Sequence, residues 1–338
     1  MAIWLQRIEL ITTTSEIIGY KSGLALTQDR LIQLTPTDYS DVWDGPDEEP
    51  VRIRSEEFED IIANILYRLG NISTPSTAPI GITQYLKYKD DPDNLKIHES
   101  VMLLFIEMLR KGLEDEEKTG NEIIDPTPFV QECRKCHGII GAKMAIEILK
   151  DLDHQQQRSP WAPYRRVEWK DTSDLNDLFK SESLATFYGS FLDQRFIDYL
   201  SQNFDDVDQI NWRKFEGLAC EFFERQGFYV EIGEGRNDGN IDARVWPAKD
   251  TSSQPPTLLV QCKRQQRKIG KVVVKALWAD ITHEDAESGL IVTTSTLSPG
   301  AKKVCTARSY PVEQADRATL RTWIKAMRSP ASGIMLGE

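Results

Sequence analysis

The stretch that decides the fold begins at Asn211 and contains four segments in order: NWRKFEGLACEFFERQGF (211–228), EGRNDGNIDARVW (234–246), TLLVQCKR (257–264) and GLIVTTS (289–295). In the first segment, apolar residues recur at helical spacing behind the N-cap Asn211, and Gly227 is placed to end the helix. FYVEIG, IDARVW and TLLVQCK predict three successive strands. A helix over about 270–285, the strand GLIVTTS and a helix opened by Ser298 and Pro299 follow. This order predicts an α/β domain of the type αβββαβ, with a mixed central sheet flanked by helices.

Two of the predicted strands carry polar residues that can meet. Side chains alternate faces along a strand, so Gln261 and Lys263 share one face of TLLVQCK. The same alternation puts Asp242 on the face of Arg244 and leaves the opposite face to Ile241, Ala243 and Val245. The polar loop 247–256 is long for a hairpin but compatible with one. If the two strands pair, Asp242 lies beside Gln261, with Lys263 one step along.

These side chains have the chemistry of a phosphodiester-hydrolysis site. A carboxylate and an amide oxygen can hold a hard divalent cation such as Mg²⁺, which also takes substrate phosphate oxygens, and Mn²⁺ can act as a substitute. A nearby ammonium can orient or deprotonate a water and offset the charge of the transition state. A carboxylate followed by Gln-x-Lys is also a common coincidence, so the order of the surrounding elements is what favours a site.

The chain resembles the catalytic domain of Mrr-type restriction endonucleases, within the PD-(D/E)xK nuclease superfamily, over about residues 211–327. The resemblance rests on four motifs in the expected order: FEGL (215–218), RNDGNID (236–242), VQCKR (260–264) and TTSTLSPGA (293–301). It implies a restriction-endonuclease-like fold and Mg²⁺-dependent cleavage of DNA. A role in genome defence, such as restriction of foreign or modified DNA, is a further implication.

The resemblance also implies a role for each site residue. Asp242 corresponds to the metal-binding acid, Lys263 to the catalytic lysine, and Glu216 to the helix-borne acid near the metal. Gln261 stands where the superfamily often has Glu or Asp, so a neutral amide replaces a carboxylate among the metal ligands Asp242, Gln261 and Glu216. Asn240 replaces the usual second Gly, and Asn is the residue that best accepts a left-handed turn.

Alternative functions fit the same sequence. One is a nuclease-fold subunit of a defence complex that binds nucleic acid or protein and cuts only under the control of a partner or ligand. Another is a nuclease of DNA repair. Cutting both strands generally needs two sites, so a homodimer or higher oligomer is expected for an endonuclease.

Charge divides the chain into unlike halves. The net charge of −12 is made of −16 in the first 210 residues and +4 from Asn211 onward, where 19 Lys and Arg face 15 Asp and Glu. The acidic half is poorly suited to phosphate contacts, so it is expected to recognise a signal, a protein partner or a DNA modification. A basic run immediately follows the proposed site, and we expect its members to contact the DNA backbone: Arg264, Arg267, Lys268, Lys271 and Lys275.

The chain has the length of two domains. We expect an acidic, mainly helical N-terminal domain with some strands at its start (1–157), a helical connector (158–210) and the nuclease domain (211–338). Residues 1–54 predict strands or short helices. A helix from Glu56 to about Gly70, a largely buried helix at 95–113 and a helix at 139–152 follow. Residues 183–203 predict a further helix that leads into the nuclease part.

The segment CRKCH (133–137) has the spacing of a c-type haem attachment site, but we see no secretory signal for the export that haem attachment requires. Half of a zinc site, completed by His98, His137 or His154, is an alternative, although a second Cys-x-x-Cys is absent. Two cysteines near a helix boundary are the simplest interpretation. Five cysteines make no disulfide framework, and no apolar run has membrane-spanning length, so a reducing cytoplasm without membrane attachment is the expectation.

Overall fold

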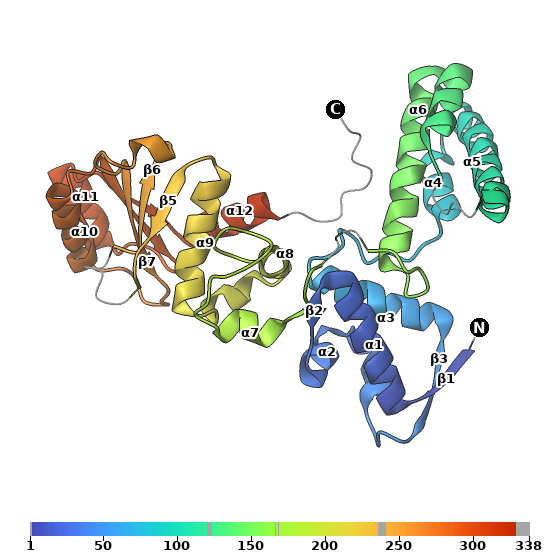
Figure 1. Ribbon diagram of the computed structural model, residues 1–338, viewed down its shortest axis with the longest axis horizontal. Coiled ribbons are helices and arrows are strands. Elements are labelled where there is room, and N and C mark those ends of the chain that lie inside the picture. Colours follow the sequence, from blue (N-terminus) through green and yellow to red (C-terminus); the bar gives the residue numbers. More distant parts are fainter. Residues whose placement is uncertain (1, 120–123, 166, 168, 236–240, 329–338) are drawn as a thin grey trace.

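The computed structural model describes residues 2–119, 124–165, 167, 169–235 and 241–328. Figure 1 shows a C-terminal α/β part, a central connecting part and an N-terminal part from which a group of long helices projects. The N-terminal elements are β1 (Ala2–Gln6), α1 (Arg7–Ser22), β2 (Leu24–Ala25), α2 (Gln28–Leu34), η1 (Thr37–Trp43), β3 (Pro50–Arg54), α3 (Ser55–Arg68), α4 (Ile80–Tyr88), α5 (Pro92–Thr119) and α6 (Thr127–Arg158).

The connecting part and the C-terminal part follow along the chain. The connecting elements are β4 (Ser173–Asp174), α7 (Leu175–Lys180), α8 (Gln194–Gln202) and η2 (Phe204–Asp208). The C-terminal elements are α9 (Trp212–Arg225), β5 (Tyr229–Ile232), β6 (Ala243–Trp246), η3 (Lys249–Thr251), β7 (Leu258–Lys263), α10 (Lys271–His283), β8 (Ser288–Thr293), α11 (Pro299–Arg308), β9 (Val312–Ala315) and α12 (Arg317–Met327).

The C-terminal part is the mixed sheet that the sequence predicts. Its strand order is β5-β6-β7-β8-β9, antiparallel from β5 to β7 and parallel from β7 to β9. The αβββαβ order is confirmed, from α9 through β8. The short strand β9 and the helix α12 extend it, and β9 was not predicted because its four residues carry no clear alternation.

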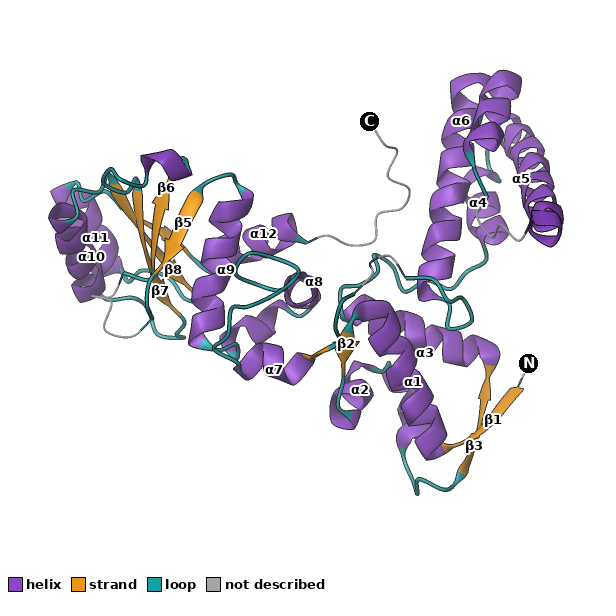
Figure 2. Cartoon of the chain, viewed as in Figure 1, coloured by secondary structure: helices purple, strands orange, loops and turns teal. Residues whose placement is uncertain are grey.

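Helices cover both faces of this sheet (Figure 2). On one face, Leu259 and Ile291 pack with α10 and α11 in a buried cluster. On the other face, Val260 and Val292 belong to the larger cluster that includes α9 and α12. Alternate residues of β7 therefore face opposite layers, as a strand buried on both faces requires.

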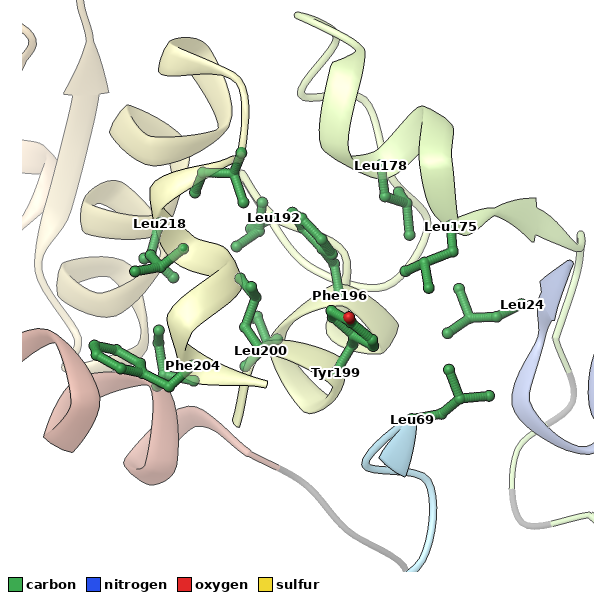
Figure 3. Packing of buried hydrophobic residues seen from close by; sticks show 14 of the residues in the cluster. Leu24, Leu69, Leu175, Leu178, Leu192, Phe196, Tyr199, Leu200, Phe204 and Leu218 are labelled. Atoms are coloured by element: carbon green, nitrogen blue, oxygen red, sulfur yellow. The ribbon is translucent and has the colours of Figure 1, made fainter. Parts of the chain in front are cut away.

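The larger core continues out of the C-terminal part into the connecting and N-terminal parts. Figure 3 shows Leu24 and Leu69 near Tyr199 and Phe196 of α8, with Leu218 of α9 further along the same cluster. Because these apolar side chains form one buried cluster, the parts pack together through a shared core rather than through a bare linker.

Three expectations for individual segments are corrected by the structure. Residues 183–193 are not helical, and only Gln194–Gln202 forms a helix there. The buried Glu221 carboxylate explains this difference. Its Oε2 accepts the backbone N–H groups of Ser190, Phe191 and Leu192, which holds these residues in a non-helical turn before α8. The helix α5 is not largely buried, since Leu103 is 70% exposed. The first 54 residues contain the helix Arg7–Ser22, which is longer than the short helices expected there.

The alternation assumed for IDARVW is also wrong at its first two residues. β6 begins at Ala243, so Ile241 and Asp242 precede the strand. Ile241 packs with Leu259 in the cluster beneath α10, on the face opposite Ala243. Arg244 faces α10, where it forms a bidentate ion pair with Glu284. The side chain of Asp242 is therefore not fixed by the period of the strand.

Candidate active site

Glu216 reaches the sheet from the second turn of α9. The side chain of Asn211 caps this helix by accepting the backbone N–H of Arg213 at 2.8 Å. Glu216 is 6% exposed, because the face of α9 that carries it packs on the sheet. The following Gly217 lets α9 lie close to the segment before α8, since a Cβ there would lie 2.9 Å from the carbonyl oxygen of Phe191.

Asp242 lies where β6 and β7 separate. Its backbone N–H donates to the carbonyl oxygen of Val260 at 2.9 Å, and its own carbonyl accepts from Gly233 at 2.9 Å. Its side-chain Oδ2 accepts the backbone N–H of Cys262 at 2.5 Å. The carboxylate thus takes the place of a backbone acceptor where the β6–β7 pair ends, and this holds it near Glu216.

The two carboxyl groups share a buried environment. Burial raises the pKa of Glu216 to about 8, a hydrogen bond from Arg213 opposes this rise, and the hydrogen-bonded carboxyl of Asp242 adds to it. Arg213 Nη1 lies 2.8 Å from Glu216 Oε2, and its Nη2 donates to the carbonyl oxygen of Gly233 at 2.7 Å. Arg213 therefore binds Glu216 and the backbone beside Asp242, while burial next to a second acid favours the protonated form of Glu216.

Gln261 and Lys263 come from the end of β7, on either side of the residue that binds Asp242. Gln261 is 2% exposed and is paired in register with Ile291 of β8. Lys263 is partly exposed, and its carbonyl oxygen accepts from Thr293 Oγ1 at 2.7 Å. The thiol of Cys262 between them has a pKa raised by burial and by Asp242 and Glu216, while Lys263 acts in the opposite direction.

The structure therefore brings two of the four predicted residues, Glu216 and Asp242, into hydrogen-bonding contact. Gln261 and Lys263 lie on the neighbouring strand β7, where they alternate with Cys262 and share the face of Leu259 that packs against α10, whereas Cys262 faces the layer of α9 and Glu216. Asn240 lies outside the described residues.

The basic run lies next to this end of the sheet and is divided between a loop and a helix. Arg264, Arg267 and Lys268 are exposed in the loop after β7, and Lys271 and Lys275 are exposed on α10. Arg264 is engaged within the chain, because its Nη1 donates to the carbonyl oxygen of Asp208.

Sequence reasoning missed two contributors to the site. Arg213 pairs with Glu216 at the i,i+3 spacing typical of helix ion pairs, and this spacing was visible in WRKFEG. The backbone N–H of Cys262 had no signal in the sequence, because any residue offers the same donor and only the register of β7 aims it at Asp242.

Metal-ligand chemistry elsewhere has little support. Cys133 is buried in the core of the α5–α6 helices, where burial raises its pKa to about 11, whereas Cys136 is exposed. His137 Nε2 lies 2.8 Å from Ser100 Oγ. Within the described ranges, no group of three or more His, Cys, Asp and Glu could hold a metal ion. Among these residues, Cys133 and Cys136 therefore have no third ligand for a zinc ion.

Over the part of the chain that the structure covers, every helix is too short or too polar to cross a bilayer.

Comparisons with known proteins give three matches. Over 131 residues the chain is 23% identical to the uncharacterized protein y4cE of Sinorhizobium fredii (strain NBRC 101917 / NGR234), covering 38% of this chain and 34% of that protein. The chain thus spans about a third of the length of this relative. A solved structure, the MspJI restriction endonuclease in complex with a 27-mer oligonucleotide, is 19% identical with a TM-score of 0.26, covering 51% of this chain and 37% of that one. Residues 207–324 match the family model of the Mrr catalytic domain, a restriction endonuclease domain, and in this region the chain resembles that family.

Proposed function

We propose that this chain is a metal-dependent DNA endonuclease that hydrolyses phosphodiester bonds. The observation that carries the proposal is the buried pair of Glu216 and Asp242 at the start of β6, with Gln261 and Lys263 on the neighbouring strand β7. This pair lies within the segment that matches a restriction endonuclease domain, and the charge of +4 from Asn211 onward suits a polyanionic substrate.

The donor set fits Mg²⁺, with Mn²⁺ as a substitute. Two carboxylates and an amide supply only oxygen ligands, which hard divalent cations prefer. Burial beside a second acid raises the pKa of Glu216, and a cation bound between the two carboxylates would offset the same charge. Asp242, Glu216 and Gln261 would hold the ion, which when bound supplies positive charge to the phosphate and acidifies a water.

The other groups of the chain position and stabilise the reacting atoms. Lys263 is partly exposed at the end of β7, where its ammonium would orient the attacking water and offset phosphate charge, and its neutral amine would accept a proton from that water. The Cys262 N–H keeps the Asp242 carboxylate fixed, and Arg213 keeps Glu216 against the sheet. Burial of both acids excludes water from one side of the site, which strengthens their interaction with a cation.

Cleavage of supercoiled plasmid by the full chain, with Mg²⁺, with Mn²⁺ and with chelator, tests the proposal. Nicked or linear products should form only with metal. They should disappear in Lys263→Ala and Asp242→Asn, while both variants still melt cooperatively. Lys249→Ala is the matched control, because Lys249 is exposed in η3, beyond the opposite end of β6. Equal cleavage by Lys263→Ala and the wild type would remove Lys263 from the mechanism.

A nuclease under the control of a partner or ligand is the second candidate. The contact that favours it is the ion pair of Arg213 with Glu216, which occupies a proposed metal ligand. In that case the chain alone would bind DNA without cutting it, and cleavage would begin only when the activating molecule is added. The acidic N-terminal region, with its charge of −16, is the expected receiver of such a signal, and a defence role in the cytoplasm fits either candidate.

A further inference from the structure

Two arginines of α12, Arg317 and Arg321, are held by a short acidic stretch that precedes the nuclease part. This stretch, which we call the acidic segment, comprises Asp205 to Asp208 in η2. Arg317 Nη1 lies 2.9 Å from both carboxylate oxygens of Asp208, and its Nη2 lies 2.8 Å from Asp205 Oδ1. Arg321 Nη2 lies 3.9 Å from the same Asp205 oxygen.

The acidic segment also touches the edge of the candidate active site. Arg264 follows Lys263 directly, and its Nη1 donates to the backbone carbonyl oxygen of Asp208. Asp208 therefore lies between the end of β7 and the start of α12. Basic residues from both elements, Arg264 after β7 and Arg317 of α12, thus contact the same acidic segment.

The aromatic ring of Phe204 packs against the guanidinium groups of both arginines. Phe204 is 4% exposed, and the guanidinium carbons of Arg317 and Arg321 lie 5.1 Å and 4.3 Å from its ring centre. Figure 3 shows Phe204 at the end of the buried cluster, beside the ribbon of α12. This contact does not involve the carboxylates, so both arginines keep a rigid support when the acids move away.

The carboxylates occupy positions that phosphate oxygens can take. A guanidinium binds the two oxygens of a carboxylate and those of a phosphate with the same two-pronged geometry. The side chains of Asp205, Arg321, Arg317 and Asp208 are 87%, 51%, 34% and 29% exposed, and ion pairs that remain in contact with solvent are weak. A duplex backbone can therefore replace the acids without unfolding the segment.

We propose that Arg317 and Arg321 extend the DNA-binding surface of the nuclease and that the acidic segment occupies this surface until a DNA backbone displaces it. This inference rests on the proposed function, because it names further contacts of the same substrate. The acidic segment is in turn tied to the N-terminal part, where Asp206 Oδ2 lies 3.1 Å from Arg30 Nη2. A change in the N-terminal part can thus reach the DNA-binding surface through one short stretch of chain.

Equilibrium binding of a fluorescent duplex tests this without cleavage. The full chain carries Lys263→Ala throughout, divalent metal is left out, and the Kd is measured over a range of salt concentrations. Asp205→Asn with Asp208→Asn should tighten binding about threefold or more at low salt, because two competing anions are removed. Arg317→Gln with Arg321→Gln should weaken binding and flatten the salt slope by roughly two, about one for each lost phosphate contact.

The combined variant separates release of the arginines from a general change of charge. When all four substitutions are present, the gain from the two asparagines should vanish. Asp250→Asn is the matched control, because it removes an exposed carboxylate in η3 and should leave the Kd within about twofold. If Asp208→Asn prevents folding, Asp205→Asn alone carries the test, since its exposed side chain is not needed by the core.

Three results would overturn the inference. They are unchanged affinity in the asparagine variant, an equal gain from Asp250→Asn, and a gain that persists without the arginines. None of these affects the proposed function, provided that the chain binds DNA and cuts it with metal. Absence of DNA binding in all variants is a fourth result that would overturn the inference, and plasmid cleavage would then decide the proposed function separately.

Discussion

The proton held between Glu216 and Asp242 gives a prediction that needs no substrate. Burial raises the pKa of Glu216 to about 8, from 4.5 for an ordinary side chain of this type. The folded chain therefore keeps a proton that the unfolded chain releases at much lower pH. The stability associated with this proton is fully present below the unfolded pKa and is lost as pH rises through the folded pKa.

The size of the effect follows from these two values. A difference of one bound proton changes the free energy of unfolding by about 1.4 kcal/mol for each pH unit. Between about pH 6.5 and about pH 8.0, where half of the folded molecules have lost this proton, the free energy of unfolding falls by about 1.6 kcal/mol. For a chain of this size, that amounts to about 3 °C in Tm.

Thermal unfolding in chelator at the two pH values measures this loss. Glu216→Gln should remove it, because the amide has no proton to give up. Glu224→Gln should keep it, since Glu224 is exposed on the same helix. Arg213→Gln should move the midpoint of the loss to higher pH, because the ion pair that opposes the raised pKa is gone.

Added Mg²⁺ should reverse the loss. A metal ion binds the ionised pair, so it should raise Tm more at the higher pH than at the lower one. If the wild type and Glu216→Gln show the same dependence on pH, with and without Mg²⁺, then the carboxyl pair neither shares a proton nor binds a cation.

Further predictions concern the metal ligands, the connecting part and the DNA surface. Gln261→Glu should lower Tm in chelator, because it adds a third buried acid. The same variant should show a larger rise in Tm than the wild type when Mn²⁺ is added, and a smaller rise would place the ion elsewhere. Glu221→Ala should lower the free energy of unfolding by about 3–5 kcal/mol, since three backbone N–H groups lose the buried carboxylate that accepts them. A loss below about 1 kcal/mol in urea unfolding would contradict the contact. Lys271→Gln with Lys275→Gln should flatten the salt slope of DNA binding by about two, and an unchanged slope would make them solvated surface residues.

Much of the C-terminal fold could be predicted because each element there carries its own local signal. The helix at Trp212–Arg225 has a cap, an apolar face and an ending glycine. The strand at 288–293 is apolar on both faces because two helical layers enclose it. Once these elements are in order, the sheet brings the end of β7 beside the start of β6, and the candidate site follows.

The remaining features depend on contacts between residues that are distant in the sequence. The side chain of Asp242 does not follow the strand alternation of IDARVW, because the backbone N–H of Cys262 in β7 binds it. Residues 183–193 have helical composition, but the buried Glu221 holds them in a turn. From the sequence, the acidic segment contributes only to the net charge of the N-terminal half. No local pattern predicts that Arg317 lies beside it.

The central claim is that Glu216, Asp242 and Gln261 surround one divalent ion beside Lys263. The most direct measurement is an anomalous difference map from crystals of the full chain grown with Mn²⁺. We expect one strong peak between the two carboxylates, within ligand distance of the Gln261 side-chain oxygen. A peak at another place, or none at a Mn²⁺ concentration that supports cleavage, would contradict the account.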